Sequence, residues 1–356
     1  MKVLIDICHP AHFHFFKKPI DILESLGHEV VITSRDKEVA IKLIEESGRE
    51  HQCLYHNVGE GIWGLATELL GRNFALYRYI RKEKPDVMAA IGGIFVAQVG
   101  AFTRIPSIAF YDTENAKLQN LFTYPFASVV SVPDCYQGRV PPHTDRYKGY
   151  HELSYLHPDS FEASREIAVD SGLSPTGDTF LIRVVSWKAN HDIGEEGWSQ
   201  ELLEKVVIFL SQRGKVIVSS EGPLPEKLER FAYLGNPSNL HHVMAFCRLF
   251  VGESATMASE SVVLGVPAIY AANTGRGYCD EQEHKYGLLR NLRTLDFKEL
   301  ETLIRELLLI DDNEVKRRWQ SMLDNMIDVP NHVVNLILQA GENISELRRE
   351  LNHARR

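Results

Sequence analysis

Three histidines near the N-terminus offer the first chemistry in this sequence. His9, His12 and His14 follow the apolar run Val3–Ile7. The pKa of histidine lies near neutral pH, so a neutral imidazole there can take a proton from a hydroxyl group. Phosphate contact, packing in a rigid turn and metal binding are the alternatives. The spacing matches no strong metal motif, and no carboxylate lies nearby in the sequence, so we expect no metal.

A second chemical stretch runs from Leu249 to Tyr270 and reads as strand, tight loop, helix and strand. Ser254 and Thr256 stand where the helix begins, and backbone N–H groups at such a position favour a diphosphate. Glu260 comes about one turn later, where a carboxylate can bind both hydroxyls of a ribose. The alternative is that the hydroxyls only cap the helix and the carboxylate complements its dipole.

The polar segment that follows this strand, residues 272–283, extends the same site. Arg276 can face a phosphate, and Asp280 and Gln282 can hydrogen-bond sugar hydroxyls. Together with the preceding loop, these residues predict a nucleotide-sugar site.

In the N-terminal half, two further strand ends carry candidate residues. Gly92 and Gly93 follow one predicted strand, and Asp112 and Glu114 follow the next. Either carboxylate can bind acceptor hydroxyls or replace His12 as the base. Asp112 is also a common turn former, so a purely local role is the alternative. We favour an acceptor-side role for this pair of loops.

The elements that must position these residues alternate between short apolar runs and amphipathic helices. Such runs, rich in valine and isoleucine, indicate parallel βαβ units. The predicted strands are Val3–Ile7, Glu29–Thr33, Gln52–His56, Asp86–Ile91, Ser107–Tyr111, Ser128–Val132, Phe180–Val185, Lys215–Ser219, Leu249–Val251 and Ala268–Ala271. The predicted helices include Phe16–Leu26 and Pro225–Tyr233, and only helices are expected after Ala271. Ligands bind such sheets at the carboxyl ends of the strands, where the candidate residues lie.

The length of 356 residues predicts two domains, since one domain usually has 100–200 residues. We expect an N-terminal, acceptor-side domain over 1–155 and a nucleotide-sugar domain over 156–330. A C-terminal helix over 331–356 can cross back to the first domain. The run rich in tyrosine and histidine at 142–160 is interpreted as the crossing between the domains.

Ser254–Pro267 followed by Asp280-Glu281-Gln282 resembles the donor-site signature of GT-B glycosyltransferases. The likeness is closest to the family that adds N-acetylglucosamine to the peptidoglycan lipid precursor, and it extends to residues 85–102 and 105–115. HPAHFHFF, YDTEN, KGYHELSYLHP and VSWKANHDIG resemble a GT-B-like family catalogued as domain of unknown function 354.

The resemblance implies a GT-B architecture, in which two Rossmann-like domains with parallel sheets face a central cleft. It implies that Ser186 meets the diphosphate. Counted back from Gly27, His12 takes the position of a histidine in the resembling transferases, so we place it ahead of His14 and His9 as the general base. The family's glycines before this histidine are absent, and so is an arginine for phosphate, for which Lys188, Arg276 or His191 can substitute.

Charge and composition limit the partners. Residues 1–157 carry 17 basic and 18 acidic residues, and the remainder carries 22 and 30, so neither half predicts nucleic-acid binding. Five scattered cysteines and the lack of a signal-peptide pattern predict a cytoplasmic protein. The segment Ile62–Lys82 mixes Trp63 with basic residues such as Arg72 and can lie on the inner face of a membrane, although a core-facing helix is the favoured interpretation.

The leading hypothesis is inverting transfer of a sugar from a nucleotide diphosphate sugar to a hydroxyl acceptor, with lipid-linked acceptors included. Surface glycan or polysaccharide synthesis would use such an activity, and it needs no cofactor. A nucleotide-sugar hydrolase or epimerase on the same fold is an alternative. A non-catalytic nucleotide-sugar-binding protein is a third, kept open by the missing glycines and arginine.

Overall fold

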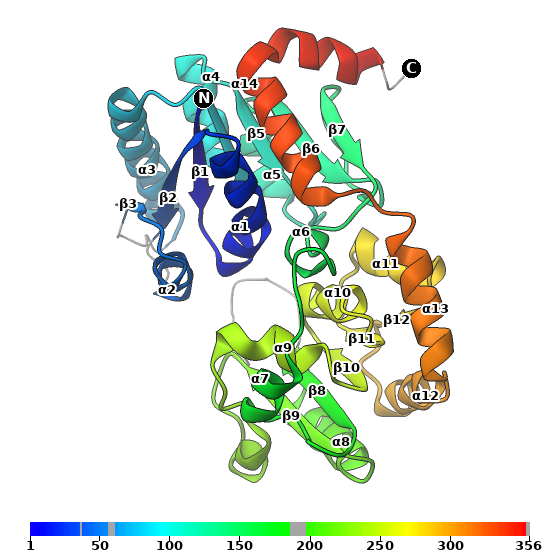
Figure 1. Cartoon of the computed structure of the whole chain (residues 1–356). Coiled ribbons are helices and arrows are strands. Elements are labelled where there is room, and N and C mark those ends of the chain that lie inside the picture. Colours follow the sequence, from blue (N-terminus) through cyan, green and yellow to red (C-terminus); the bar gives the residue numbers. More distant parts are fainter. Residues whose placement is uncertain (36–37, 56–60, 186–196, 354–356) are drawn as a thin grey trace. The chain divides into compact units, whose positions relative to one another are not determined.

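The computed structural model describes residues 1–35, 38–55, 61–185 and 197–353. The chain divides into two compact units (Figure 1). Unit 1 comprises Met1–Tyr155 and Ile327–Arg356, and unit 2 comprises Leu156–Met326. Each unit has a sheet of parallel strands with interleaved helices, which confirms the predicted α/β class.

The sheet of unit 1 has the strand order β3-β2-β1-β4-β5-β6-β7. Its strands are β1 (Lys2–Ile7), β2 (Glu29–Arg35), β3 (Gln52–Tyr55), β4 (Val87–Ile91), β5 (Ser107–Phe110), β6 (Val129–Pro133) and β7 (Thr144–Tyr147). β1 pairs in parallel with both β2 and β4, so the chain reverses its direction of travel across the sheet between these strands. Ligands bind parallel sheets outside the carboxyl ends at such a point.

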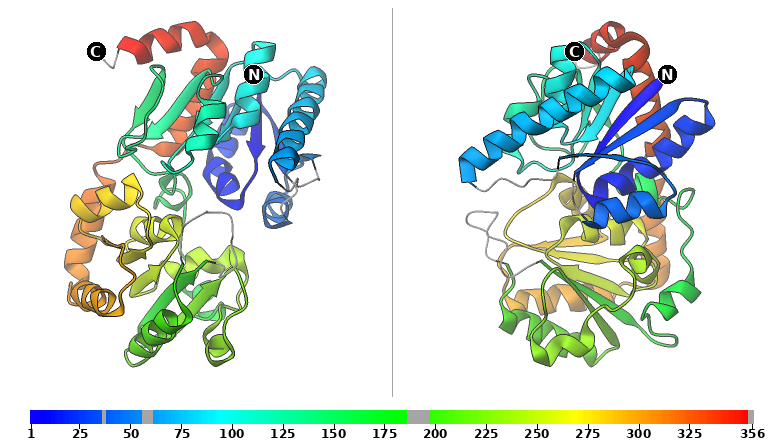
Figure 2. Two further views of the ribbon diagram at one scale, coloured as in Figure 1. Left: turned by 180° about the vertical axis from the view of Figure 1, so that it is seen from behind. Right: turned by 90° about the vertical axis from the view of Figure 1, so that its left-hand side faces the viewer.

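Helices cover both faces of this sheet. They are α1 (Pro10–Ser25), α2 (Glu38–Glu46), α3 (Gly61–Glu83), α4 (Ile94–Thr103), α5 (Lys117–Thr123) and α14 (Val329–His353), with α6 (Leu153–Leu156) at the end of the first segment. α14 packs against α1 and β4, and α3 packs against α4 on the opposite face (Figures 1 and 2). The C-terminal helix therefore completes unit 1.

Unit 2 has a sheet with the order β12-β11-β10-β8-β9. Its strands are β8 (Thr179–Val184), β9 (Lys215–Ser220), β10 (Leu249–Gly252), β11 (Ala268–Ala271) and β12 (Leu289–Leu292). Its α-helices are α7 (Arg165–Asp170), α8 (Gln200–Ser211), α9 (Leu240–Met244), α10 (Ala255–Val263), α11 (Gly277–His284), α12 (Phe297–Leu308) and α13 (Asp312–Leu323), with 3₁₀ turns at Glu226–Phe231 and Pro237–Asn239.

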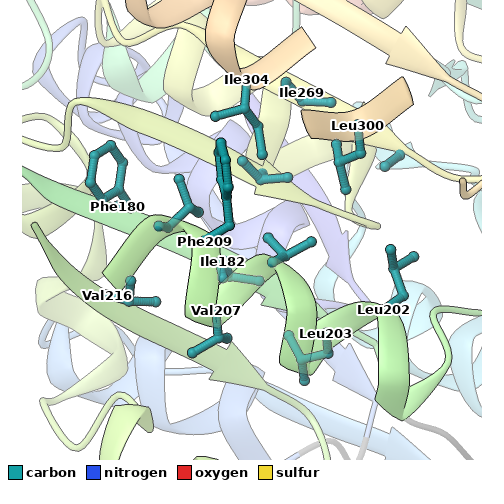
Figure 3. Packing of buried hydrophobic residues seen from close by; sticks show 14 of the residues in the cluster. Phe180, Ile182, Leu202, Leu203, Val207, Phe209, Val216, Ile269, Leu300 and Ile304 are labelled. Atoms are coloured by element: carbon teal, nitrogen blue, oxygen red, sulfur yellow. The ribbon is translucent and has the colours of Figure 1, made fainter. Parts of the chain in front are cut away.

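The core of unit 2 lies between its sheet and helices α8 and α12 (Figure 3). Leu203 on α8 and Ile304 on α12 have no exposed surface. Phe209 of α8 meets Phe297 of α12 edge to face, with ring centroids 6.3 Å apart. This packing holds the sheet whose strand-end loops carry the predicted nucleotide site.

Four elements differ from the sequence-based expectation. β7 lies in the segment interpreted as a domain crossing, and β12 lies where only helices were expected. α1 begins at Pro10, although the amphipathic pattern predicted its start at Phe16. The helix predicted over Pro225–Tyr233 is the 3₁₀ turn Glu226–Phe231. Each missed strand has only four residues and includes polar ones, so an apolar run does not mark it.

None of the helices in the described part of the chain is long and apolar enough to span a membrane.

The packing of α8 gives a stability prediction. Leu203→Ala should lower the free energy of unfolding of unit 2 by about 2–5 kcal/mol, because the substitution leaves a cavity in a closely packed core. Ile208→Ala on the same helix is the matched control, since Ile208 is 58% exposed; its effect should stay within about 0.5 kcal/mol. Urea unfolding of both variants measures the difference, and equal losses would contradict this packing.

Candidate functional site

The histidines after β1 lie at the start of a helix. His9 is the N-cap of α1, and its Nδ1 accepts a hydrogen bond from the backbone N–H of Ala11 at 3.2 Å. Pro10 follows as the first helical residue, a position that suits its fixed φ angle. His12 and His14 therefore lie on the first turns of α1, and the predicted loop is confined to Cys8 and His9.

His12 makes a hydrogen bond that defines its neutral tautomer. The backbone N–H of Cys8 donates to Nδ1 of His12 at 3.3 Å. Because this nitrogen accepts, a neutral His12 carries its proton on Nε2. The ring then presents a donor, which suits contact with a phosphate or hydroxyl oxygen. His14 stacks on Tyr155 with ring centroids 5.3 Å apart, so packing accounts for much of its environment.

A buried ion pair lies beneath this start of α1. The guanidinium of Arg72 on α3 donates to both carboxylate oxygens of Asp6, at 3.0 and 2.9 Å, and also reaches Sγ of Cys8 at 2.9 Å. Thr33 donates to the same carboxylate from β2 at 2.8 Å. Arg72 and Asp6 are both 2% exposed. Arg72 is therefore a structural residue and cannot contribute to a basic membrane-facing stripe, the less favoured of the two interpretations of this helix.

Cys8 is not suited to act as a nucleophile. Burial, together with the neighbouring charge of Asp6, raises the pKa of its thiol to about 12. Since the thiolate is the reactive form, this cysteine is inert near neutral pH.

The glycine pair after β4 is required by backbone geometry. Gly92 and Gly93 have φ angles of 71° and 52°, in the left-handed region that favours glycine. A Cβ on Gly92 would collide with the side chain of Gln119. The carbonyl of Gly92 also accepts hydrogen bonds from the hydroxyls of Tyr111 and Thr123. Local structure thus explains both glycines, and a role in acceptor binding stays a prediction.

Asp112, after β5, is held on both of its oxygens. The hydroxyl of Thr113 donates to Oδ1 at 2.9 Å, and Oδ2 lies 3.2 Å from Nδ1 of His151. His151 is 5% exposed, packs on Phe15 and has no hydrogen-bond partner for its buried Nε2 among the described residues. With Nδ1–H directed at a carboxylate, a neutral His151 has its lone pair on Nε2, the arrangement of a proton acceptor.

Glu114 lies in the same loop as Asp112, but its partner is a backbone group of another loop. Its Oε1 accepts a hydrogen bond from the backbone N–H of Gln137 at 3.2 Å. This contact ties the loop after β5 to the loop after β6.

In unit 2, Ser254 caps α10 at the carboxyl end of β10 (Figure 1). Its side chain accepts a hydrogen bond from the backbone N–H of Met257 at 3.3 Å. Thr256 lies half-buried in the first turn. The predicted strand–loop–helix arrangement is present, with the positive end of α10 at the strand-end edge of the sheet.

Glu260 lies on α10 and pairs with a histidine from a neighbouring helix. Its Oε1 is 3.0 Å from Nε2 of His241 on α9, and Glu260 itself is only 6% exposed. His242 follows His241 in the chain, and its pKa is lowered by burial and secondarily by the charge of His241. The Nδ1 of His242 accepts a hydrogen bond from the backbone N–H of Ser164. A ligand of Glu260 would thus also meet His241.

Glu253 precedes the cap and connects two other segments. Its carboxylate accepts hydrogen bonds from the backbone N–H groups of Val185 at 2.9 Å and Trp198 at 2.5 Å. Burial raises the pKa of Glu253, against the effect of these two donors. The carboxylate thereby joins the end of β8 to the end of β10.

The three candidate residues after β11 lie on α11 or at its start, and each has contacts within the protein. Arg276 is the N-cap residue of α11 and donates to the carbonyl of Gly275, and Asp280 lies 3.4 Å from Arg293. Gln282 has no exposed surface, and its amide donates to the hydroxyl of Ser259 on α10 at 2.8 Å. In this arrangement Gln282 holds α11 against α10 through its amide N–H, and its amide oxygen has no partner among the described residues; contact with a sugar stays a prediction.

Ser186, Lys188 and His191 lie outside the described residues, so the structure does not place them. Within the described ranges, no group of three or more histidine, cysteine, aspartate or glutamate side chains is arranged to hold a metal ion.

Sequence reasoning missed His151, His241, Glu253 and the Asp6–Arg72 pair. Each acts through a partner far away in the sequence, and only the folded chain brings the two together. The only local signal for any of these residues was the position of two of them at strand ends. Asp6 lies at the end of β1, and Glu253 directly follows β10.

Two sequence comparisons relate the chain to other proteins. Residues 1–339 match the model of a family described as protein of unknown function (DUF354). An uncharacterised protein of Methanocaldococcus jannaschii is 23% identical over 286 residues, which cover 76% of this chain and 81% of the relative.

Solved structures resemble the whole chain. UDP-GlcNAc 2-epimerase from Methanocaldococcus jannaschii, in complex with UDP-GlcNAc and UDP, has a TM-score of 0.67 and 13% identity, covering 95% of this chain and 99% of the epimerase. MurG from Acinetobacter baumannii has a TM-score of 0.62 and 14% identity, covering 95% and 100%. At such identity the likeness shows the fold, which is the two-domain Rossmann-like GT-B type expected from the sequence.

The buried ion pair gives a second stability prediction. Arg72→Met should lower the free energy of unfolding of unit 1 by about 3–5 kcal/mol, because it leaves the Asp6 carboxylate buried and unpaired. Arg78→Met, at an exposed position of the same helix, is the control, with an expected change within about 0.5 kcal/mol. Urea unfolding measures both. A double variant, Asp6→Leu with Arg72→Met, should recover part of the loss, and no difference between Arg72→Met and Arg78→Met would contradict the pair.

Proposed function

Since this chain belongs to the DUF354 family, described as of unknown function, we propose from its site chemistry that it is a glycosyltransferase. The donor is a nucleotide diphosphate sugar, and the acceptor is a hydroxyl compound of surface glycan or polysaccharide synthesis. Unit 2 binds the donor, and unit 1 supplies the acceptor-side groups.

The observation that carries the proposal is the arrangement around α10. Ser254 caps the helix at the carboxyl end of β10, and the Glu260 carboxylate lies further along the same helix against His241. A helix N-terminus favours a diphosphate, and a carboxylate beyond it suits ribose hydroxyls. A solved structure with the same fold contains UDP-GlcNAc and UDP, which supports a nucleotide-sugar donor.

On the acceptor side we assign different proton roles to two histidines. His12 accepts at Nδ1 from Cys8 and so offers an Nε2–H donor to a reacting oxygen. His151, held at Nδ1 by Asp112, has the tautomer that accepts a proton at Nε2. In the transfer, the acceptor oxygen bonds to the anomeric carbon and gives its proton to the Asp112–His151 pair, whose carboxylate is the more exposed member, and the nucleotide diphosphate departs with the electrons of the broken bond.

Epimerisation of a nucleotide sugar is the second candidate, favoured by the likeness to a UDP-GlcNAc 2-epimerase. In the related epimerases the loop after the fourth strand usually carries an acid, whereas this chain has Gly92-Gly93-Ile94 there. Epimerisation at C2 breaks a C–H bond and needs no acceptor. If the donor takes up deuterium at C2 in heavy water without an acceptor, the proposed transfer is wrong and the protein is an epimerase.

A thermal-shift screen against UDP, GDP, CDP, dTDP and their sugar conjugates tests the donor site. One nucleotide series should stabilise the protein, by about 2.7 kcal/mol at 100 times its Kd. Glu260→Ala should reduce this shift because the ribose contact is lost, while the exposed Glu201→Ala on α8 should leave it unchanged. No shift with any nucleotide, or an equal shift for Glu260→Ala, would contradict the donor site.

Substitutions at the two histidine positions test the proton roles. Asp112→Asn should lower the kcat of nucleotide release by about 10²–10⁴-fold, because His151 loses the carboxylate that orients it. His12→Ala should also lower kcat, whereas His12→Gln should retain most of it, since an amide can donate but cannot take up a proton. Steady-state rates with the donor found by the screen measure these effects. If His12→Gln falls as far as His12→Ala, the base is His12.

A further inference from the structure

A pocket of about 590 Å³ lies in unit 1, where α3 and α4 end. Its lining includes Arg81 and Lys84 from the end of α3, Arg104 from the end of α4, and the rings of Tyr77 and Phe102. β4 and β5 begin directly after these helix ends. The pocket therefore lies at the amino-end edge of the sheet, opposite the edge that carries His12 and Asp112.

The charge of this pocket is entirely positive. Arg81, Lys84 and Arg104 are exposed, and no carboxylate contributes to the described lining. The neighbouring acidic residues are engaged elsewhere: Glu83 pairs with Lys2, and Asp86 accepts from the backbone N–H of Lys2 at 2.7 Å. Within the described ranges, none of the three cations has an ion-pair partner. An anion can therefore approach all of them without displacing a protein carboxylate.

Two of the cations stand at strained backbone positions. Lys84 has a φ angle of 51° and Arg104 one of 62°, in the left-handed region where helix ends usually have glycine. A cation near a helix C-terminus gains some energy from the helix dipole. The dipoles of α3 and α4 each favour a cation at their own end, and the fold brings these two ends together in one pocket.

Exposed apolar side chains lie in the pocket and on the preceding turns of α3. Phe102 is 79% exposed and meets Tyr77 edge to face, and Phe74 and Leu70 on α3 are 62% and 69% exposed. Phe74 lies one turn before Arg78, so apolar and basic side chains follow each other along α3, on the outer side of unit 1 (Figure 2). Such a combination is typical of surfaces that lie on anionic lipid.

We propose that this pocket binds the phosphate head group of an anionic lipid, with Phe102 and Phe74 entering the head-group layer. The three cations neutralise the phosphate, and the rings contribute apolar contact at the depth where aromatic residues are favoured. The side chains of α3 before Thr67, with Trp63 among them, lie outside the described residues. The proposal does not depend on the donor or the reaction.

Flotation of the whole protein with lipid vesicles tests the proposal. At low salt the protein should float with vesicles that contain phosphatidylglycerol and not with vesicles of phosphatidylcholine alone, and added salt should weaken the binding. Lys84→Gly with Arg104→Gly should lower the partition coefficient about 25-fold, because each cation contributes a factor of about 5. Glycine suits both φ angles, so the variant should melt no lower than the parent.

Two control variants separate the pocket from general effects. Lys227→Gln with Lys298→Gln changes the net charge equally, with both substitutions in unit 2, and should float like the parent. Leu295→Gly places glycine at the remaining non-glycine residue with positive φ in the described chain, without a change of charge.

Phe102→Ser should weaken the binding that remains at high salt. In each variant the nucleotide-induced thermal shift should be unchanged, which keeps this test independent of the proposed function.

Three outcomes would overturn the proposal. The protein does not float with anionic vesicles at low salt, or the double glycine variant floats as well as the parent. Alternatively, inorganic phosphate stabilises the parent but not the double glycine variant, while vesicles leave both in solution. The last result would assign the pocket to a soluble anion.

Discussion

The buried ion pair of Asp6 and Arg72 determines how the candidate edge of unit 1 is built. An ionised carboxylate without a partner costs several kcal/mol to bury, so β1 and α3 reach their native positions only together. Thr33 donates to the Asp6 carboxylate and Cys8 accepts from the Arg72 guanidinium, which joins the end of β1 to β2 and α3. α1 begins two residues after Cys8. The orientation of its first turn, with His9 and His12, therefore depends on this pair.

In unit 2 a carboxylate likewise connects a strand end to other segments, but its partners are backbone N–H groups and not a buried cation. Glu253 accepts hydrogen bonds from the backbone N–H groups of Val185 and Trp198, and so joins these two positions to the end of β10. The raised pKa of Glu253 reflects the burial that this role requires. Ser254 follows at once and starts α10. In both units, then, the chain places an acidic residue at a strand end, and the helix that carries the candidate residues follows within a few positions.

How much the sequence predicts depends on how local the cause is. The apolar runs marked β1, β4, β8 and β10 correctly because burial on both faces of a parallel sheet demands such runs. β7 escaped prediction because it is short and carries Asp145 and Arg146. The early start of α1 was missed because its cap is a histidine, a residue that the usual capping preferences do not include.

The candidate site was predictable in its position and less so in its contacts. Ser254 capping α10 follows from residue type and spacing alone, and the structure has that cap. The partners His241 of Glu260 and His151 of Asp112 come from other elements, so no local pattern contains them. Gln282 shows the reverse case. Its place after β11 suggested a ligand contact, but Ser259 on α10 lies within hydrogen-bond distance and the side chain is buried there.

The distribution of paired and unpaired charges separates folding from function in unit 1. Asp6 and Arg72 neutralise each other in the interior, so these two groups are arranged by the fold. Lys84 and Arg104 are different, because they add backbone strain without gaining an ion pair in the described chain. Glycine at either position would remove strain from the folded chain. The helix dipoles favour a cation at each of these ends, and a negatively charged partner outside the chain would be attracted to both cations at once.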